Sequence, residues 1–240
     1  MKIKELELYT SNLEVQTAFY SKTLELKIVE KTEKSVAFQI GTSILKLTYR
    51  ETVTPYHYAI NIPANQEKEA LEWLKNRLEV LKDGDSEIQY FDFWDANAIY
   101  FYDKDNNIGE FIARKKLKND TDKAFDKNSL LEISEIGLPT TDIQREYDIL
   151  NKAMGIPIHS GSFDRFCSIG DENGLFIIIN KDLKKDWYPT KDAPYSSNFS
   201  IQLEEKGCDY KFEYKKELSV KLFKKDRASI YGGFHLYVLK

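Results

Sequence analysis

The sequence predicts an α+β fold in which βαβββ modules follow one another along the chain. Three observations support this prediction. A strand, a helix and three strands fit residues 3–49, and the same order restarts at His57. Residues 98–114 read as a hairpin of an aromatic strand, a polar turn and an apolar strand. Each module leaves one face of its sheet open, so repeated modules are expected to pair.

The first module begins with a half-buried strand, because Glu5, Glu7 and Tyr9 alternate with leucines. Ser11 and Asn12 are cap candidates for the helix that follows, which should run for about eleven residues. The expected strands of this module are 3–9, 27–30, 36–40 and 44–49, the last two joined by a turn at Gly41 and Thr42.

The second module opens where His57, Ala59 and Asn61 alternate with apolar residues before Pro63 ends the strand. Alanine and leucines at helical spacing predict a helix over residues 66–78. The remaining strands are expected at 87–90, 98–102 and 107–113.

A charged run rich in Lys and Asp follows Arg114 and has the composition of a solvated linker. We therefore expect a first domain at 1–115, a linker at 116–129 and a second domain at 130–240. The third module is expected as a strand at 132–138, a helix at 143–154 closed by Gly155, and strands near 156–159, 163–169 and 175–179. A fourth, abbreviated module starts near Asn198, with its helix short or replaced in 204–216 and strands at 218–223 and 234–238.

Composition excludes several functional classes. Hydrophobic residues make up 42% and charged residues 31%, and no apolar run approaches the roughly 20 residues that span a bilayer. The net charge is −4 and the lysines are scattered among glutamates, so neither nucleic acid nor a membrane is an expected partner. Only Cys167 and Cys208 are present and the first residues lack a signal peptide's apolar core, so we expect reduced thiols and a cytoplasmic protein.

Glu110 is the residue that most needs a chemical explanation. Side chains alternate along a strand, so Ile108, Glu110 and Ile112 share one face while Phe111 and Ala113 take the other. A carboxylate among apolar neighbours is costly unless it is paired, hydrogen-bonded or bound to a metal. Glu110 is therefore a candidate site residue.

Three segments resemble the vicinal oxygen chelate superfamily, which includes glyoxalase I, extradiol dioxygenases, methylmalonyl-CoA epimerase, and fosfomycin and bleomycin resistance proteins. Residues 5–26 resemble its first strand and Phe-Tyr-x-x-x-Leu-Gly-Leu helix end, with Glu25 in place of the glycine. Residues 57–63 resemble the opening strand of a second module. Residues 101–111 resemble the closing hairpin Phe-x-Asp-Pro-Asp-Gly-Asn-x-x-Glu-Phe, with Lys104 and Asn106 replacing Pro and Gly.

This resemblance implies modules that pair into two half-open barrel domains, and a site in the hollow of the first. By its register that hollow presents Glu5, Lys46, His57 and Glu110. Glu5, His57 and Glu110 would be the metal ligands, and Mn, Fe(II), Ni or Zn would be the ion. The implied activity is a lyase, isomerase or dioxygenase reaction on a small substrate with two adjacent oxygens, with Glu110 or Glu5 relaying a proton.

A second interpretation needs no metal and no other cofactor. Lys46 could take the ion's place by pairing with Glu5 and Glu110, which would leave a small-molecule binding protein of the resistance type. A third interpretation is an assembly or regulatory protein with closed cavities. The sequence leaves all three open, as it does the choice between monomer and homodimer.

Aromatic residues in the same phase as these carboxylates are candidates for the substrate pocket. Tyr9, Tyr100 and Tyr102 share that phase and, with Lys46, would contact a flat, partly apolar ligand. The loop at 187–189 could form a lid or pack against the first domain. The corresponding positions of the second half contain an apolar residue and indicate a lapsed site: Glu135, Ile177, Asn198 and His235.

Overall fold

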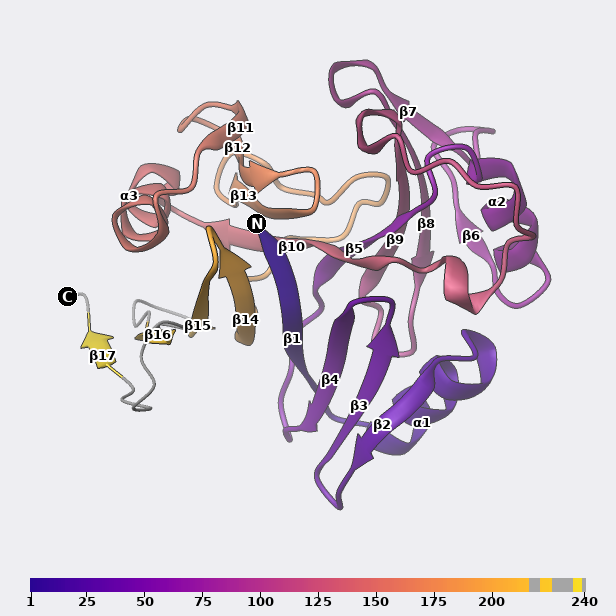
Figure 1. Cartoon of the computed structure of the whole chain (residues 1–240), viewed down its shortest axis with the longest axis horizontal. Helices are drawn as coiled ribbons and strands as arrows, with labels where there is room; N and C mark the ends of the chain where they lie inside the picture. The colour runs from indigo at the N-terminus through magenta and orange to yellow at the C-terminus, as the bar shows by residue number, and fades with distance from the viewer. Residues whose placement is uncertain (216–220, 226–234, 239–240) are drawn as a thin grey trace.

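The computed structural model describes residues 1–215, 221–225 and 235–238. Its strands form two large sheets, which we name by their central strands (Figure 1). The β1 sheet has the order β17-β16-β15-β14-β1-β4-β3-β2, and the β5 sheet has the order β11-β12-β13-β10-β5-β9-β8-β6, with β7 also paired to β8. Few helices accompany these sheets, so the fold is α+β, as predicted.

The β1 sheet is built from the two ends of the chain. Its strands are β1 (Lys2–Thr10), β2 (Lys27–Lys31), β3 (Ser35–Ile40), β4 (Ser43–Tyr49), β14 (Phe199–Glu205), β15 (Cys208–Tyr214), β16 (Lys221–Lys225) and β17 (His235–Val238). Helix α1 (Leu13–Ala18) and one π-helical turn (Phe19–Thr23) connect β1 to β2 and together account for the predicted helix.

The β5 sheet takes the middle of the chain. Its strands are β5 (His57–Ile62), β6 (Val80–Leu81), β7 (Gln89–Phe91), β8 (Ala96–Tyr102), β9 (Ile108–Arg114), β10 (Glu132–Thr140), β11 (Ile158–Gly161), β12 (Phe166–Asp171) and β13 (Gly174–Asn180). Helix α2 (Glu67–Lys75) follows β5 in the chain, and helix α3 (Ile143–Met154) follows β10. Helix α3 has the predicted bounds, and Gly155 closes it in the left-handed conformation with φ +65°.

The sheets pair the modules in an order that the sequence did not indicate. The first strand of the first module, β1, is hydrogen-bonded to β14 of the fourth, and β5 of the second is hydrogen-bonded to β10 of the third. The expectation that the first two modules share one hollow is therefore wrong. Each sheet also draws strands from both sides of residues 116–129. All four opening strands carry similar alternation, so the pattern alone could not identify their partners.

In the abbreviated fourth module, a strand replaces the helix of residues 204–216, which is one of the two predicted outcomes. Strand β15 directly follows β14 through a turn that contains Lys206 and Gly207, both with positive φ. Parts of the strands expected at 218–223 and 234–238 lie outside the described residues. No helix of the described residues is long and apolar enough to cross a membrane.

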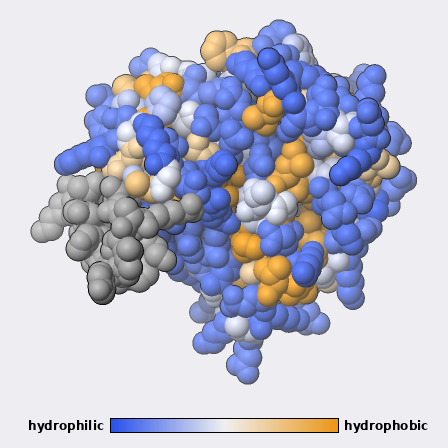
Figure 2. All heavy atoms as spheres, in the orientation of Figure 1, coloured by the Kyte–Doolittle hydropathy of each residue, from blue (hydrophilic) through white to orange (hydrophobic). Residues whose placement is uncertain are grey.

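Alternation along the strands gives the β5 sheet two different apolar faces. Tyr58, Phe111 and Ile136 belong to the main core between the sheets, whereas Ala59 and Ile112 belong to a second cluster on the opposite face. This separation confirms the predicted alternation around Glu110. The outer surface in the view of Figure 2 is largely hydrophilic, with hydrophobic atoms gathered over β3 and β4.

The two sheets meet where β4 and β10 begin. Ser43 Oγ donates a hydrogen bond to the Ile3 carbonyl oxygen at 2.6 Å and accepts one from the Ile133 amide at 3.0 Å. The neighbouring Gly41 has φ +51°, and a Cβ there would lie 1.7 Å from the Leu131 carbonyl oxygen. The predicted turn at Gly41 and Thr42 is thus also a contact between the sheets.

Candidate functional site

Three adjacent strands of the β5 sheet bring an imidazole and two carboxylates together. Glu110 on β9 and Glu135 on β10 are both register partners of Ala59 on β5, one on each side. His57 precedes Ala59 by two residues and therefore points to the same face. One ligand atom from each of His57, Glu110 and Glu135 lies within 4.8 Å of the others, and all three residues are buried.

Hydrogen bonds hold these side chains in place. His57 Nε2 and Glu110 Oε2 are 3.0 Å apart. Tyr100 lies next to Glu110, and burial together with the charge of Glu110 raises the pKa of the Tyr100 hydroxyl. Glu135 accepts a hydrogen bond from Nη2 of Arg114, whose Nε donates to Asn61 Oδ1 at 3.2 Å. Arg114 is the largest fully buried side chain among the described residues.

Burial and mutual repulsion perturb the titration of this cluster. Burial, reinforced by the charge of Glu110, raises the pKa of Glu135 to about 7, although the Arg114 guanidinium opposes the shift. Burial next to Glu110 also raises the pKa of Tyr100 well above its usual range. The phenol of Tyr100 therefore stays neutral and can donate to Glu110.

The cluster fits a divalent cation by its charge and by its donors. Two carboxylates face only one guanidinium, so the buried group has an excess of negative charge when both are ionised. In the described part of the chain, the buried His57 Nδ1 has no hydrogen-bond partner. One nitrogen and two carboxylate oxygens suit ions such as Mn(II) or Fe(II), and no thiolate is present to favour softer ions.

The cluster lies at a cavity of about 430 Å³, a volume typical of small-molecule sites. Its lining is dominated by aromatic rings and contains one Lys: His57, Tyr90, Phe91, Asp92, Phe93, Trp94, Tyr100, Glu110, Glu135, Phe166, Ile177, Lys184, Trp187 and Tyr188. Phe93 and Tyr90 are 72% and 57% exposed, which places them at the mouth of the cavity.

Residues 181–198, the loop between β13 and β14, close one side of this cavity. The Trp187 ring centroid lies 4.9 Å from that of His57. It fits because Gly137 on β10 has no side chain, since a Cβ there would lie 2.9 Å from Trp187 Cζ2. The Tyr188 hydroxyl lies 2.7 Å from Gln89 Oε1 and 3.0 Å from Asp83 Oδ2. The loop therefore packs on the second module.

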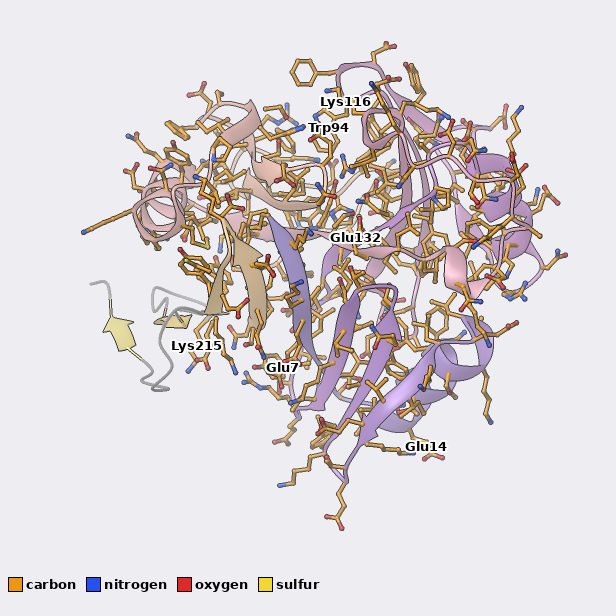
Figure 3. All side chains as sticks on the ribbon, viewed as in Figure 1. Glu7, Glu14, Trp94, Lys116, Glu132 and Lys215 are labelled. Carbon is orange, nitrogen blue, oxygen red and sulfur yellow. The ribbon has the colours of Figure 1, made fainter. Side chains whose placement is uncertain are left out.

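Trp94, labelled in Figure 3, also lines the cavity. It comes from the turn between β7 and β8, and its indole Nε1 donates to Ser160 Oγ on β11 at 3.1 Å. Its ring lies 6.2 Å from that of Phe166 and 5.4 Å from the Arg114 guanidinium carbon. Trp94 thus connects the second and third modules over the buried cluster.

The structure brings together His57, Glu110 and Tyr100 of the predicted site but places three other predicted residues in the β1 sheet. There Glu5 Oε1 accepts a hydrogen bond from Gln202 Nε2 at 2.9 Å, and Lys46 Nζ lies 3.8 Å from Glu7 Oε1. Tyr9 lies under the Arg50 guanidinium, whose carbon is 3.4 Å from the ring centroid. These positions follow from the pairing of the first module with the fourth.

The remaining predicted residues are distributed between the sheets. Tyr102 donates to Asp192 of the 181–198 loop and is outside the cavity lining. Ile177 lines the cavity, whereas Asn198 lines a smaller hollow beside Tyr9. The side chain of His235 lies outside the described residues.

The sequence interpretation grouped Glu135 with Ile177, Asn198 and His235 in a lapsed site of the second half, and it assigned neither Trp94 nor Lys184 to a site. Of the members of that group whose side chains the structure describes, only Glu135 and Ile177 line this cavity. Glu135 was identified at the position of the third module that corresponds to Glu5 of the first. Knowledge of the strand pairing would have placed it beside Glu110. Trp94 and Lys184 lie in connections, whose course the strand pattern does not determine.

Comparisons with known proteins identify the family and the fold. The model of the Glyoxalase/Bleomycin resistance protein/Dioxygenase superfamily matches residues 2–127. No curated protein matches the chain.

Two solved structures are similar over nearly the whole chain. One is a candidate dioxygenase from Bacillus subtilis subsp. subtilis str. 168, at 11% identity and TM-score 0.58, covering 99% of this chain and 84% of its own. The other is a mutant glyoxalase I from Zea mays, at 14% identity and TM-score 0.53, covering 99% and 92%. At these identities the likeness shows the fold.

A third structure, a mutant of the fosfomycin resistance protein FosX from Listeria monocytogenes complexed with Mn(II), covers 48% of this chain and 90% of its own. It has 21% identity and a TM-score of 0.37. The family model spans more than half of the residues, and its match agrees with the motifs of the first two modules. This chain belongs to the Glyoxalase/Bleomycin resistance protein/Dioxygenase superfamily.

Proposed function

We propose that this protein is a divalent-metal-dependent enzyme that acts on a small molecule with two adjacent oxygens, held in the aromatic cavity of the β5 sheet. One observation carries the proposal: His57, Glu110 and Glu135 converge from three neighbouring strands, with ligand atoms within 4.8 Å of one another, at the cavity of about 430 Å³. Glu135 takes the place that the sequence interpretation gave to Glu5.

The three residues would hold the ion through one imidazole nitrogen and two carboxylate oxygens. When bound, such an ion acts as a Lewis acid that stabilises negative charge on a carbonyl or enediolate oxygen of the ligand. This chemistry is shared by lyase, isomerase and dioxygenase reactions, so the proposal covers the class and names no single reaction.

The surrounding side chains would orient the metal-binding residues and exclude water from the site. Arg114 holds one carboxylate oxygen of Glu135. Both side chains are buried, so movement of Arg114 away from Glu135 would leave a buried charge without a partner. Glu110 is hydrogen-bonded to His57 and lies next to Tyr100, and its carboxylate would take a proton from a carbon or oxygen atom of the substrate. Trp187 covers His57 and keeps this side of the site dry.

A second candidate function is a metal-free binding protein. The observation that favours it is the ion pair between Arg114 and Glu135, because a guanidinium already neutralises one of the three ligands. Ile177 also lines the cavity without a donor atom. In this case the cavity would sequester an aromatic molecule without changing it.

Metal analysis separates the two functions. The purified protein is stripped with EDTA, incubated in turn with Mn(II), Fe(II) under argon, Ni(II) and Zn(II), desalted, and measured by elemental mass spectrometry. The enzyme proposal expects about one ion per chain for at least one metal. It also expects at least a tenfold loss of affinity in His57→Ala, Glu110→Gln and Glu135→Gln, since each removes one of only three ligands.

Glu5→Gln is the matched control, because Glu5 occupies a comparable first-strand position in the β1 sheet. It should retain the ion, and circular dichroism should confirm that all variants are folded. Absence of stoichiometric binding for all four metals, or loss of the ion in Glu5→Gln but not in Glu135→Gln, would contradict the proposal.

A further inference from the structure

The cavity contains a cation that the proposed chemistry does not use. Lys184, in the 181–198 loop, is the one Lys or Arg among the described lining residues. Its side chain is only 19% exposed, and its Nζ lies 5.8 Å from the Trp187 ring centroid. The same Trp187 ring lies against His57, so Lys184 and the carboxylate cluster are both next to one indole.

Among the described residues, the ammonium group of Lys184 has few hydrogen-bond acceptors and no carboxylate within hydrogen-bond distance. Nζ donates to the Asp186 carbonyl oxygen at 2.7 Å, and its nearest carboxylate oxygen is that of Asp186, 3.9 Å away on a side chain that is 54% exposed. An ammonium has three donors, so the group retains capacity for an anion. Burial lowers the pKa of Lys184, although the carboxylate of Asp186 opposes the shift.

The remaining walls define the rest of a ligand. Phe91, Trp94 and Phe166 form one continuous aromatic wall, with ring centroids 6.3 Å and 6.2 Å apart along it. Tyr188 joins this wall through Phe91, at 5.8 Å. Such surfaces favour a flat apolar body. Asp92, Glu110 and Glu135 also line the cavity, and their carboxylates repel an anionic group from their own parts of it.

We infer that the cavity selects an aromatic molecule carrying an anionic substituent, with the anion bound by Lys184 and the ring against the aromatic wall. The inference rests on the cavity of the proposed function and deepens it by naming the ligand class. Lys184 is then a specificity residue, and an anion at Lys184 places the opposite end of the ligand towards His57 and Glu110.

Binding of a matched pair of probes tests this inference. Isothermal titration calorimetry compares 2-naphthoate with 2-naphthamide, which has a similar shape but no charge, in the presence of EDTA. The wild-type protein should bind the carboxylate about tenfold more tightly, the effect of one charge-assisted hydrogen bond. Lys184→Met should remove this preference and Lys184→Arg should keep it. Lys185→Met, the exposed neighbour, should behave as wild type.

The test is independent of the metal. Equal affinity for the two probes in the wild-type protein, a preference that survives in Lys184→Met, or failure of both probes to bind would each overturn the inference. Absence of metal binding together with a Lys184-dependent preference would reject the enzyme proposal and leave the ligand class intact.

Discussion

Replacement of Arg114 by Met gives the sharpest test of how the site is built. Arg114 is 0% exposed and Glu135 is 2% exposed, and the two side chains are hydrogen-bonded. The variant keeps the volume but leaves Glu135 with no cationic partner. Removal of one member of a buried ion pair costs about 3–5 kcal/mol. For a chain of this size that loss corresponds to a fall in Tm of roughly 6–20 °C.

Urea unfolding in EDTA, followed by circular dichroism, measures the loss for Arg114→Met, Glu135→Gln and the double variant. The double variant removes both charges, so it should recover most of the stability that Arg114→Met loses. The cost should also depend on pH. The folded-state pKa of Glu135 is already raised, to about 7, so its protonated form favours folding at low pH and that contribution is lost as the pH rises through 7.

Loss of Arg114 raises this pKa further, because the opposing charge is gone. The destabilisation should therefore be larger at pH 8 than at pH 5. A cost below 1 kcal/mol at pH 8, or strictly additive effects in the double variant, would refute the view that Arg114 compensates a buried carboxylate.

Three further predictions concern the frame of the site. Gly41→Ala should lower the free energy of unfolding in urea by more than about 2 kcal/mol, because its Cβ would overlap the Leu131 carbonyl oxygen. Gly84→Ala is the control, since Gly84 has φ +58° and open space around it, and it should cost about 1 kcal/mol. Equal costs for the two variants would contradict the close approach at Gly41. Gly137→Val should displace Trp187 from His57, shift the tryptophan emission to longer wavelength and cost about 1–3 kcal/mol; an unchanged spectrum would argue against the contact. Tyr188→Phe removes the hydroxyl that lies near Gln89 and Asp83, so it should lower the free energy of unfolding by about 1 kcal/mol and accelerate limited proteolysis within residues 181–198. Tyr195→Phe is the control: the Tyr195 side chain is exposed, so proteolysis should not change.

Local patterns in the sequence determined the elements of this protein and the faces of its strands. The alternation around Glu110 placed it on the face opposite Phe111, and the bounds of α3 followed from its apolar spacing and Gly155. These features depend on neighbours along the chain, which a periodicity of two or 3.6 residues reports directly. Glu110 was identified from this alternation, whereas His57 was assigned to the site by the resemblance of residues 57–63 and 101–111 to the family.

The tertiary structure alone decided which module completes the site. Because β5 pairs with β10, the site contains Glu135 where the sequence predicted Glu5, and Lys46 and Tyr9 lie in the other sheet. The cavity is also lined by residues from connections: Trp94, Lys184 and Trp187. Hydrogen bonds between strands are made by backbone groups that every residue carries, so opening strands with similar alternation are equivalent until the complete chain packs. The donor set of the site therefore depends on long-range pairing, which the local pattern does not encode.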